Sequence, residues 1–485
     1  MAATHNRSIT QQQLFILFFT AFLLRSFVFY SYLSTGERYK QPDSLDYHSA
    51  ALTIKYGFGM SRPDTGEPQF WRTPGYPIYL LPFYKIFKQN GFQFSDAQTA
   101  QKASIWVQIL LSSFIPIILF YLALYLTGSF LIAFITAWIS VFHLGLVLTS
   151  GYLLTEGIGL IPFYLFLYYF YRSFRPIFQQ NGKTLWWPQQ IIMAAIMLAI
   201  YTWIRPMGNY IALVAILILL LFAQDNLKQK AKKTALFLII FYTLLSPWYI
   251  RNYRLTGQWF FCPMFGAYLN SFCAPRIVST LNNIDLLESW KQLGFAAQTR
   301  HQELNEESKL TGFYTPREFA CGQIAWPIFL NYPWLAFSDW IREVFKTTFD
   351  LYSSQLTAFV NGCFFYDPLI EYLSNKLADC LYRTPMPLFM RLIVILEVIY
   401  AGLLWIGLIG GLCFFVMMPT LRHFEVHQSR NAIFGLWMVI LPMIAATVFM
   451  TGGFGYARLR LPIEPLMIIL SLTWWYMIYM WYKKG

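Results

Sequence analysis

The sequence predicts an all-α polytopic membrane protein with about ten transmembrane helices. Hydrophobic residues make up 57% of the 485 residues, and charged residues make up only 12%. A soluble protein of this length would need far more polar surface. The apolar residues also occur in runs of about 17–25, the length needed to cross roughly 30 Å of hydrocarbon.

Hydropathy along the chain places the individual spans. The segments 189–204 and 207–223 are short and close together, so they form either two spans or one broken unit. We predict spans near residues 12–33, 104–126, 129–149, 153–172, 189–204, 207–223, 234–250, 390–417, 431–450 and 463–482.

Basic residues in the short loops predict the orientation of these spans, because Lys and Arg are enriched in cytoplasmic loops. If the spans alternate in direction, the basic loops fall on one side, which places both termini in the cytoplasm. The residues behind this prediction are Arg172, Arg175, Lys183, Lys228, Lys230, Lys232, Lys233, Arg422, Arg430, Lys483 and Lys484.

Two long segments, 34–103 and 251–388, then lie on the outer side, and we treat residues 1–485 as one transmembrane domain that carries both. The second segment contains Cys262, Cys273, Cys321, Cys363 and Cys380. An extracytoplasmic compartment permits disulfides. The odd number of cysteines nevertheless favours buried free thiols.

The net charge of +13 does not by itself indicate a nucleic-acid partner. In a membrane protein, a basic excess is typical of cytoplasmic loops and of contact with anionic lipid. No nucleic-acid recognition motif accompanies the charge, so we expect no nucleic-acid partner. The sequence also lacks a Walker loop and a G-x-G-x-x-G motif after a strand, so we expect no nucleotide or nucleotide-sugar site.

Four stretches on the outer side of the predicted spans carry a family resemblance. They are "PDSLDYHSAALTIKYGFGMS" from residue 42, "WRTPGYPIYL" from 71, "SPWYIRNYRLTG" from 246 and "GYARLRLPIEPLMIIL" from 455. Two weaker matches are "YLLTEGIGL" and "WIRP". In this order and on this side, they resemble GT-C glycosyltransferases of the protein-mannosyltransferase (family 39) and aminoarabinose-transferase type.

The resemblance implies a GT-C fold, with outer juxtamembrane helices and with the active site on the periplasmic side of a bacterial inner membrane. It also implies transfer of a hexosyl or pentosyl group from a polyprenyl-phosphate donor, with inversion, to a lipid, glycan or protein acceptor. Two residues depart from the family pattern. The acids Asp43 and Asp46 stand three apart rather than adjacent, and Arg72 stands where Lys is common.

This chemistry assigns roles to the charged residues of the outer side. A positioned carboxylate takes the acceptor proton, and the catalytic candidates are Asp43, Asp46 and Glu156. Arginines stabilise the charge that develops on the departing phosphate. The candidates for binding the donor phosphate are Arg72, Arg205, Arg251, Arg254, Arg458 and Arg460.

Each candidate also has a structural interpretation. Asp43 stands where it could cap the helix that follows, and Asp46 could complete a capping box. Thr155 could cap the next helix beside a solvated Glu156. The arginines could extend to lipid headgroups without binding substrate.

Two other classes of function remain as alternatives. One is a ligase or polymerase that uses a diphosphate-linked glycan, and the other is a transporter or flippase, which would place ionisable groups near the bilayer midplane. Whether the reaction requires a divalent metal ion is also left open by the sequence. Two acids spaced by three could bind one, although a phosphate-linked donor does not strictly need it.

Overall fold

The computed structural model of the chain describes residues 9–88, 97–173, 187–309, 312–352, 388–417, 427–451 and 457–483. Over these residues every regular element is a helix, and an isolated bridge pairs Ser61 with Pro68. The predicted all-α class is therefore confirmed. Four residues of the orientation argument, Arg175, Lys183, Arg422 and Lys484, lie outside the described ranges.

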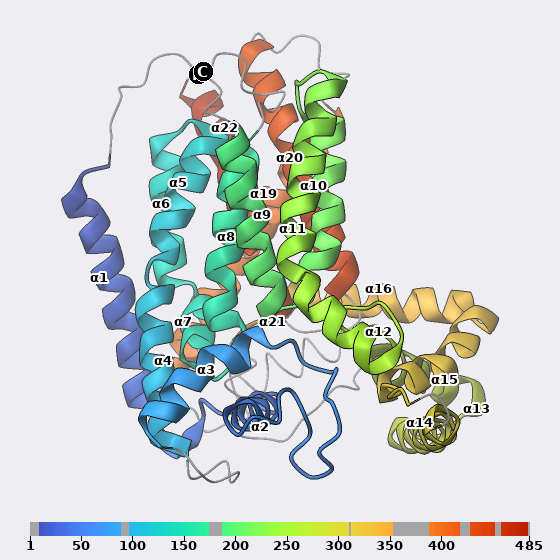
Figure 1. Cartoon of the computed structure of the whole chain (residues 1–485). Coiled ribbons are helices and arrows are strands. Elements are labelled where there is room, and N and C mark those ends of the chain that lie inside the picture. Colours follow the sequence, from blue (N-terminus) through green and yellow to red (C-terminus); the bar gives the residue numbers. More distant parts are fainter. Residues whose placement is uncertain are drawn as a thin grey trace.

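The long helices run side by side in one bundle (Figure 1). Each predicted span coincides with one helix or with two consecutive helices. The bundle is formed by α1 (Gln11–Val28), α4 (Gln98–Ser112), α5 (Ile115–Thr127), α6 (Phe130–Phe142), α8 (Glu156–Arg172), α9 (Trp187–Ile204), α10 (Gly208–Phe222), α11 (Leu227–Thr256), α19 (Leu388–Met417), α20 (His427–Thr451) and α22 (Glu464–Tyr482).

The bundle has an apolar interior and an apolar outer surface. Side chains such as Phe163 and Leu198 are fully buried between helices, whereas Phe27 and Leu221 are 68% and 60% exposed on the outside. An outer surface of this kind suits lipid rather than water. Within the described part of the chain, five helices are individually long and apolar enough to cross a membrane, or six if the bent pair α6 and α7 (Leu144–Gly151) counts as one span.

The segments 189–204 and 207–223 form two helices rather than one broken unit. The indole of Trp203, near the end of α9, bonds the carbonyl of Leu244 in α11. Asn209, at the start of α10, contacts Tyr249 in the later half of α11, whereas Leu220 contacts Lys230 in its first turn. Since α9 and α10 run in opposite directions beside α11, the turn between them brings Arg205 to the same end of the bundle as Thr256.

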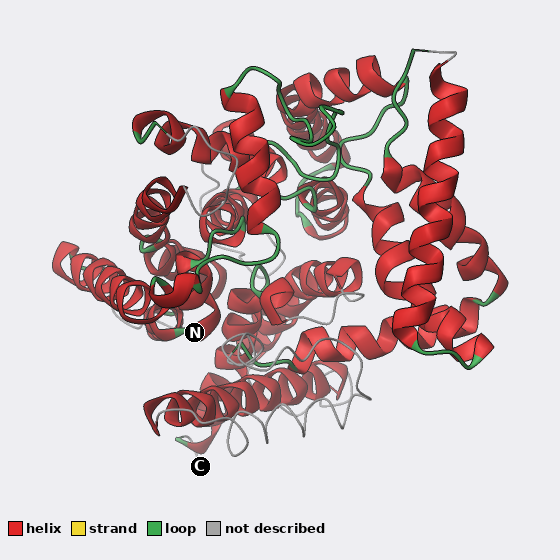
Figure 2. Ribbon diagram, turned by 90° about the horizontal axis from the view of Figure 1, so that it is seen from below, coloured by secondary structure: helices red, strands yellow, loops and turns green. Residues whose placement is uncertain are grey.

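Further helices lie at that end of the bundle (Figure 1), which Figure 2 shows from below. They come from the two predicted outer segments, although residues 353–387 of the second segment lie outside the described ranges. The helices are α2 (Ser44–Lys55) and α3 (Gly75–Ile86) from the first segment, and α12 (Met264–Tyr268), α13 (Ala274–Asn282), α14 (Leu286–Lys309), α15 (Arg317–Asn331) and α16 (Pro333–Phe349) from the second.

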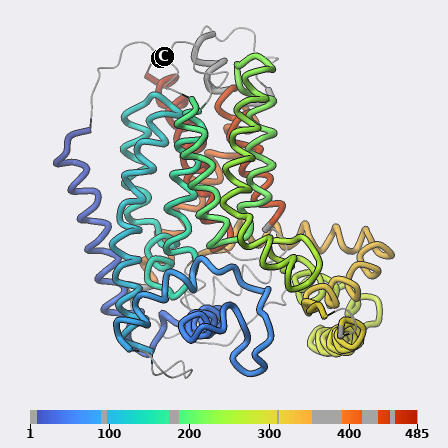
Figure 3. Tube along the Cα trace, in the orientation of Figure 1, coloured from blue at the N-terminus to red at the C-terminus, as the bar shows by residue number. Residues whose placement is uncertain are grey.

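The beginning of α1 and the end of α22 both lie at the opposite end of the bundle (Figure 3). The two predicted outer segments therefore gather at one end, and the two ends of the described chain gather at the other. This arrangement agrees with the predicted alternation of the spans.

The described cysteines are Cys262, Cys273, Cys321 and Cys413, and all four are free thiols. Cys273 and Cys321 are buried, as expected for structural thiols. Cys262 donates its thiol to the carbonyl oxygen of Trp71 at 3.5 Å, so it ties the second outer segment to the first. Cys363 and Cys380 lie outside the described residues.

Candidate active site

Asp43 and Asp46 open helix α2 at the outer end of the bundle. Asp43 occupies the N-cap position, but its side chain makes no capping hydrogen bond. Instead, its carboxylate accepts from Arg72 Nη2 at 2.8 Å and from Arg458 Nη2 at 3.1 Å. Asp46 accepts from Nε and Nη2 of Arg72 at 2.9 and 2.8 Å. The capping interpretation of these two side chains is therefore wrong.

Arg72 is held in place by its own short segment, which packs directly against the end of α9. The hydroxyl of Thr73 donates to the carbonyl oxygen of Ile204 at 2.9 Å. A Cβ atom at Gly75 would lie 2.5 Å from the carbonyl oxygen of Trp203, so only glycine permits this approach. The motif "WRTPG" thus fixes Arg72 beside the helix that ends just before Arg205.

Glu156 begins α8 and pairs with Arg205. The carboxylate lies 2.7 Å from Arg205 Nη1 and 3.9 Å from Arg458 Nε, and its side chain is only 4% exposed. Thr155 donates its hydroxyl to Glu156 Oε2 at 3.2 Å and does not cap the helix. The structural alternative, a solvated Glu156, is wrong, because this carboxylate is buried and paired.

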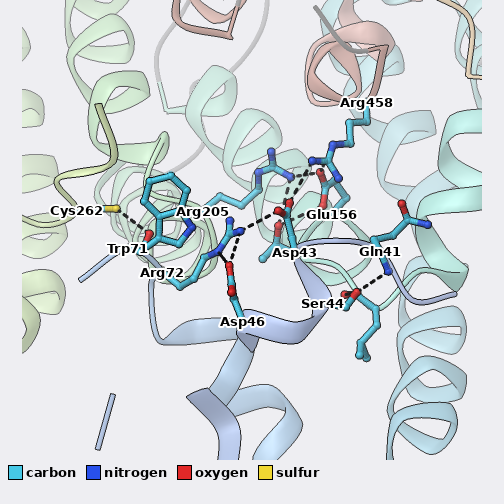
Figure 4. A network of polar contacts seen from close by, with 12 residues as sticks. Gln41, Asp43, Ser44, Asp46, Trp71, Arg72, Glu156, Arg205, Cys262 and Arg458 are labelled. Carbon is cyan, nitrogen blue, oxygen red and sulfur yellow. Dashed lines mark hydrogen bonds and ion pairs between the residues drawn. The ribbon is translucent and has the colours of Figure 1, made fainter. Parts of the chain in front are cut away.

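Arg458 connects the two halves of the site. It donates to Asp43 and also approaches Glu156, although it is separated from Asp43 by 415 positions in sequence. Together these contacts form a continuous row, Asp46–Arg72–Asp43–Arg458–Glu156–Arg205, in which carboxylates and guanidiniums alternate (Figure 4). We call these six residues the acid–arginine row.

The charges of the acid–arginine row control its protonation. Burial raises the pKa of Asp43, but the guanidiniums of Arg72 and Arg458 outweigh this effect and hold that pKa below its usual value. Burial lowers the pKa of the Arg72 guanidinium, but Tyr47, Asp43 and Asp46 outweigh this effect and raise that pKa above its usual value. Asp43 and Asp46 keep 30% and 40% of their side chains exposed, so they are the accessible acids of the row.

Arg460 lies close to Arg458 in sequence but outside the row. It is 3% exposed, and it donates to Glu464 at 3.1 Å and to the carbonyl oxygen of Thr347. Glu464 also accepts from Tyr352 and pairs with His143 at 3.0 Å. This buried cluster anchors the turn that carries Arg458.

Arg251 and Arg254 also lie apart from the row. Arg251 donates to the carbonyl oxygens of Met60 and Gln69 at 3.0 and 3.3 Å and stacks over Trp248. It therefore fastens the loop of the first outer segment to α11. Arg254 is exposed on the last turn of α11.

The row does not fit a divalent cation in this arrangement. Among the residues that the structure describes, no three His, Cys, Asp or Glu side chains converge as metal ligands. Each carboxylate of the row already has a guanidinium within 3 Å. Positive charges so close would repel a divalent ion, which needs several oxygen ligands.

Two supporting residues, His143 and Glu464, were not among the residues predicted from the sequence. Glu464 could have been found, because Arg460 and Glu464 stand four apart, the spacing of an ion pair on one helical face. His143 carries no such signal. It lies 321 positions from Glu464, and the contact requires the bend between α6 and α7.

No protein-family model matches this chain, and no curated protein matches its sequence. Among solved structures, it is similar to the Archaeoglobus fulgidus oligosaccharyltransferase in the apo form, at 12% identity over 97% of this chain with a TM-score of 0.49. It is also similar to AglB from the same organism, in complex with an inhibitory peptide and a dolichol-phosphate, at 13% identity over 95% of this chain with a TM-score of 0.46. The chain spans about half the length of these two structures, 51% and 50%.

A further similar structure is ArnT from Cupriavidus metallidurans bound to undecaprenyl phosphate. It is 11% identical, with a TM-score of 0.39, and the match covers 96% of this chain and 78% of ArnT. These similarities concern the arrangement of helices and carry no residue's role to this chain. The protein-mannosyltransferase (family 39) assignment stays a resemblance in sequence motifs.

Proposed function

We propose that this protein is a membrane glycosyltransferase that moves a sugar from a polyprenyl-phosphate donor to a hydroxyl or amine acceptor on the outer face of the membrane. The observation that carries this proposal is the acid–arginine row at one end of an apolar helical bundle. The row supplies guanidiniums for a phosphate and carboxylates for a proton within one network. Its partly exposed side chains leave it open to a ligand.

The phosphate of the donor would bind to Arg72 and Arg458, with Arg205 behind them. A phosphate offers these guanidiniums charged oxygens like those of Asp43, so the donor competes with Asp43 for the same N–H groups. Buried Glu156 holds Arg205 and keeps the inner part of the row in place. Arg251, Arg254 and Arg460 are left out of this proposed set, because the first and last fasten loops and Arg254 lies apart.

Asp43 would act as the base. In the proposed step, the acceptor oxygen or nitrogen forms a bond to the anomeric carbon, and the bond from that carbon to the phosphate oxygen breaks. The electron pair leaves with the polyprenyl phosphate, and the acceptor proton passes to the Asp43 carboxylate. Attack opposite the phosphate inverts the anomeric centre, as the family resemblance implies.

The same contacts would couple donor binding to the activity of the base. While Arg72 and Arg458 are bonded to Asp43, they hold its pKa down, and a carboxylate with a low pKa is a weak base. When the donor phosphate draws these guanidiniums away, the pKa of Asp43 rises. Asp43 therefore becomes a better base only when the donor is in place.

Substitution of Asp43 tests the proposed function. Asp43→Asn keeps the shape and removes the base, so we expect turnover to fall by about 10²–10⁴-fold while donor binding persists. The measurement is transfer of labelled sugar from a polyprenyl-phosphate donor by the reconstituted protein, with donor binding measured in parallel. Glu307→Gln is the matched control, because it removes a carboxylate that is 67% exposed on α14. Near-normal turnover in Asp43→Asn would rule Asp43 out as the base.

The alternatives give different results in the same reconstituted system. A flippase would move the donor between leaflets without forming a new glycosidic bond. A ligase or polymerase would require a diphosphate-linked glycan and would leave the monophosphate donor unused. Covalent transfer from the monophosphate donor is therefore the result that separates the proposed function from both.

A further inference from the structure

A cavity of about 700 Å³ lies between the two outer segments, beside the acid–arginine row. Asp46, at the near end of the row, is one of the residues that line it. The rest of the described lining comes from α2, from residues 61–71 and from the segment 267–321. Among the described lining residues, none comes from a long helix of the bundle, so the cavity lies at the same end of the molecule as the acid–arginine row.

Asn270, beside the cavity, has an unused hydrogen-bond acceptor. This residue lines the cavity and is 4% exposed. Its Nδ2 donates to the carbonyl oxygen of Leu293 at 3.5 Å, whereas its Oδ1 has no hydrogen-bond partner. A buried acceptor without a partner costs free energy, so this position favours a ligand that carries hydroxyl or N–H donors.

The charges around the cavity disfavour an anionic ligand. Its lining includes the carboxylates of Asp46, Asp64, Glu67 and Glu318 and the guanidiniums of Arg62 and Arg317. Glu318 is only 6% exposed. A phosphate placed here would meet more negative than positive groups, so this cavity does not suit the phosphate of the donor.

Two indole rings provide flat apolar surfaces among these polar groups. Trp71 and Trp290 both line the cavity, and Trp290 is 48% exposed. Trp71 directly precedes Arg72, so one wall of the cavity is continuous with the acid–arginine row. Sugar rings have apolar faces and hydroxyl edges, which match aromatic rings and hydrogen-bond acceptors respectively.

We infer that this cavity binds the acceptor, and that the acceptor is a hydroxyl-rich carbohydrate without phosphate groups. The inference rests on the proposed function and adds to it the chemical class of the second substrate. In this arrangement, a hydroxyl at the end near Asp46 meets the donor sugar across the row. The polyprenyl chain stays in the membrane, outside the cavity.

Direct binding tests this inference without requiring transfer. Saturation-transfer NMR on the reconstituted protein would compare a neutral disaccharide, an amine-bearing disaccharide and a phosphate-bearing disaccharide, together with a serine-containing peptide of similar mass. We expect the neutral and amine-bearing disaccharides to bind more tightly than the phosphate-bearing one. Tighter binding of the phosphate-bearing disaccharide, or binding of the peptide alone, would overturn the inference.

Variants then locate the binding site. Asn270→Leu and Trp290→Ala should each weaken disaccharide binding by about three- to tenfold. Asn270→Asp keeps an acceptor oxygen and should retain binding. Trp334→Ala is the matched control for the indole, since Trp334 is 76% exposed on α16 and does not line the cavity. Unchanged binding in both Asn270→Leu and Trp290→Ala, with all variants folded normally, would overturn the inference.

The two tests distinguish a failure of the cavity assignment from a failure of the proposed base. If the disaccharides bind in the cavity but Asp43→Asn retains turnover, the proposed base is wrong and the cavity assignment stands. If the disaccharides do not bind but transfer still depends on Asp43, the proposed function stands and the cavity assignment is wrong.

Discussion

Arg72 donates to two carboxylates at once, and this shared contact decides how the site titrates. It bonds Asp46 through two nitrogens and Asp43 through one. A guanidinium is planar and offers several N–H groups in fixed directions, so it can connect two acids that stand three residues apart on one helix. Lysine, a single ammonium, could not make the same set of contacts.

The low pKa of Asp43 predicts how kcat/KM for sugar transfer depends on pH on the acidic side. Because Arg72 and Arg458 hold this pKa below 3.8, the carboxylate is ionised throughout the physiological range. The stabilisation from these pairs is present above the pKa of an unfolded Asp and is lost as the pH falls through the lower pKa of the folded state. We expect kcat/KM, which reports the free enzyme, to show no acidic limb above about pH 4.5.

The measurement is kcat/KM for sugar transfer between about pH 4.5 and 8. Thermal unfolding at each pH serves as the control for loss of structure. An acidic limb centred near pH 6 in a protein that remains folded would contradict this prediction. It would indicate a base with a raised pKa in the free enzyme.

The close guanidiniums also predict how the protein responds to metal removal. Every carboxylate of the acid–arginine row is paired with an arginine, which repels a divalent cation. We therefore expect transfer to continue at the same rate in excess EDTA. The assay is the same transfer reaction with and without the chelator, and a loss of activity that Mg²⁺ or Mn²⁺ restores would contradict the prediction.

At the scale of elements, the link between α7 and α8 shows how a buried polar side chain positions the site. Gln108 of α4 is fully buried, and its Nε2 donates to the carbonyl oxygens of Ser150 and Tyr152 at 2.8 and 2.7 Å. Its Oε1 accepts from Tyr76 of α3 at 3.2 Å. Gln108 thereby satisfies the unwound backbone just before Glu156 and connects it to the helix that follows Arg72.

Gln108→Leu should therefore destabilise this link. It leaves two buried carbonyl groups without their donor, at a cost of about 1–3 kcal/mol each. We expect a lower thermal unfolding temperature together with lower turnover, because Glu156 and Arg205 lose their fixed position. Gln98→Leu, at an exposed position of the same helix, is the control and should change both quantities little. Equal effects of the two substitutions would contradict the positioning role of Gln108.

At the scale of the whole molecule, the site lies at one end of the bundle and the basic loop before α11 lies at the other. By the positive-inside rule, we predict that the basic end lies in the cytoplasm. This arrangement would expose the acid–arginine row and the neighbouring cavity to the extracytoplasmic side, where a polyprenyl-phosphate donor and its acceptor would meet.

Labelling of introduced cysteines in intact cells tests this orientation. Thr65→Cys and Glu307→Cys lie on exposed parts of the two outer segments and should react with an impermeant thiol reagent. Gln229→Cys, exposed at the start of α11, should react only after the membrane is opened. The unsubstituted protein gives the background of the native thiols. If only Gln229→Cys reacted in intact cells, the orientation in the membrane would be the opposite of the predicted one.

The sequence by itself determined the helical class, the position of the apolar helices and the two outer segments. Hydropathy and loop charge are local properties, and the bilayer requires backbone groups to pair within each helix. The short motifs likewise identified the acids and arginines of the outer end. What they could not give was the partner of each side chain.

Only the tertiary structure decided those partners, because the contacts join residues far apart in the chain. Arg72 meets Asp43 across 29 positions, and Arg458 meets Asp43 across 415. Arg458 and Arg460 stand two residues apart in one motif, yet their side chains reach different clusters because positions two apart on a helix point about 200° apart around its axis. Thus, local sequence specifies which helices form, while the packing of those helices specifies which charges meet.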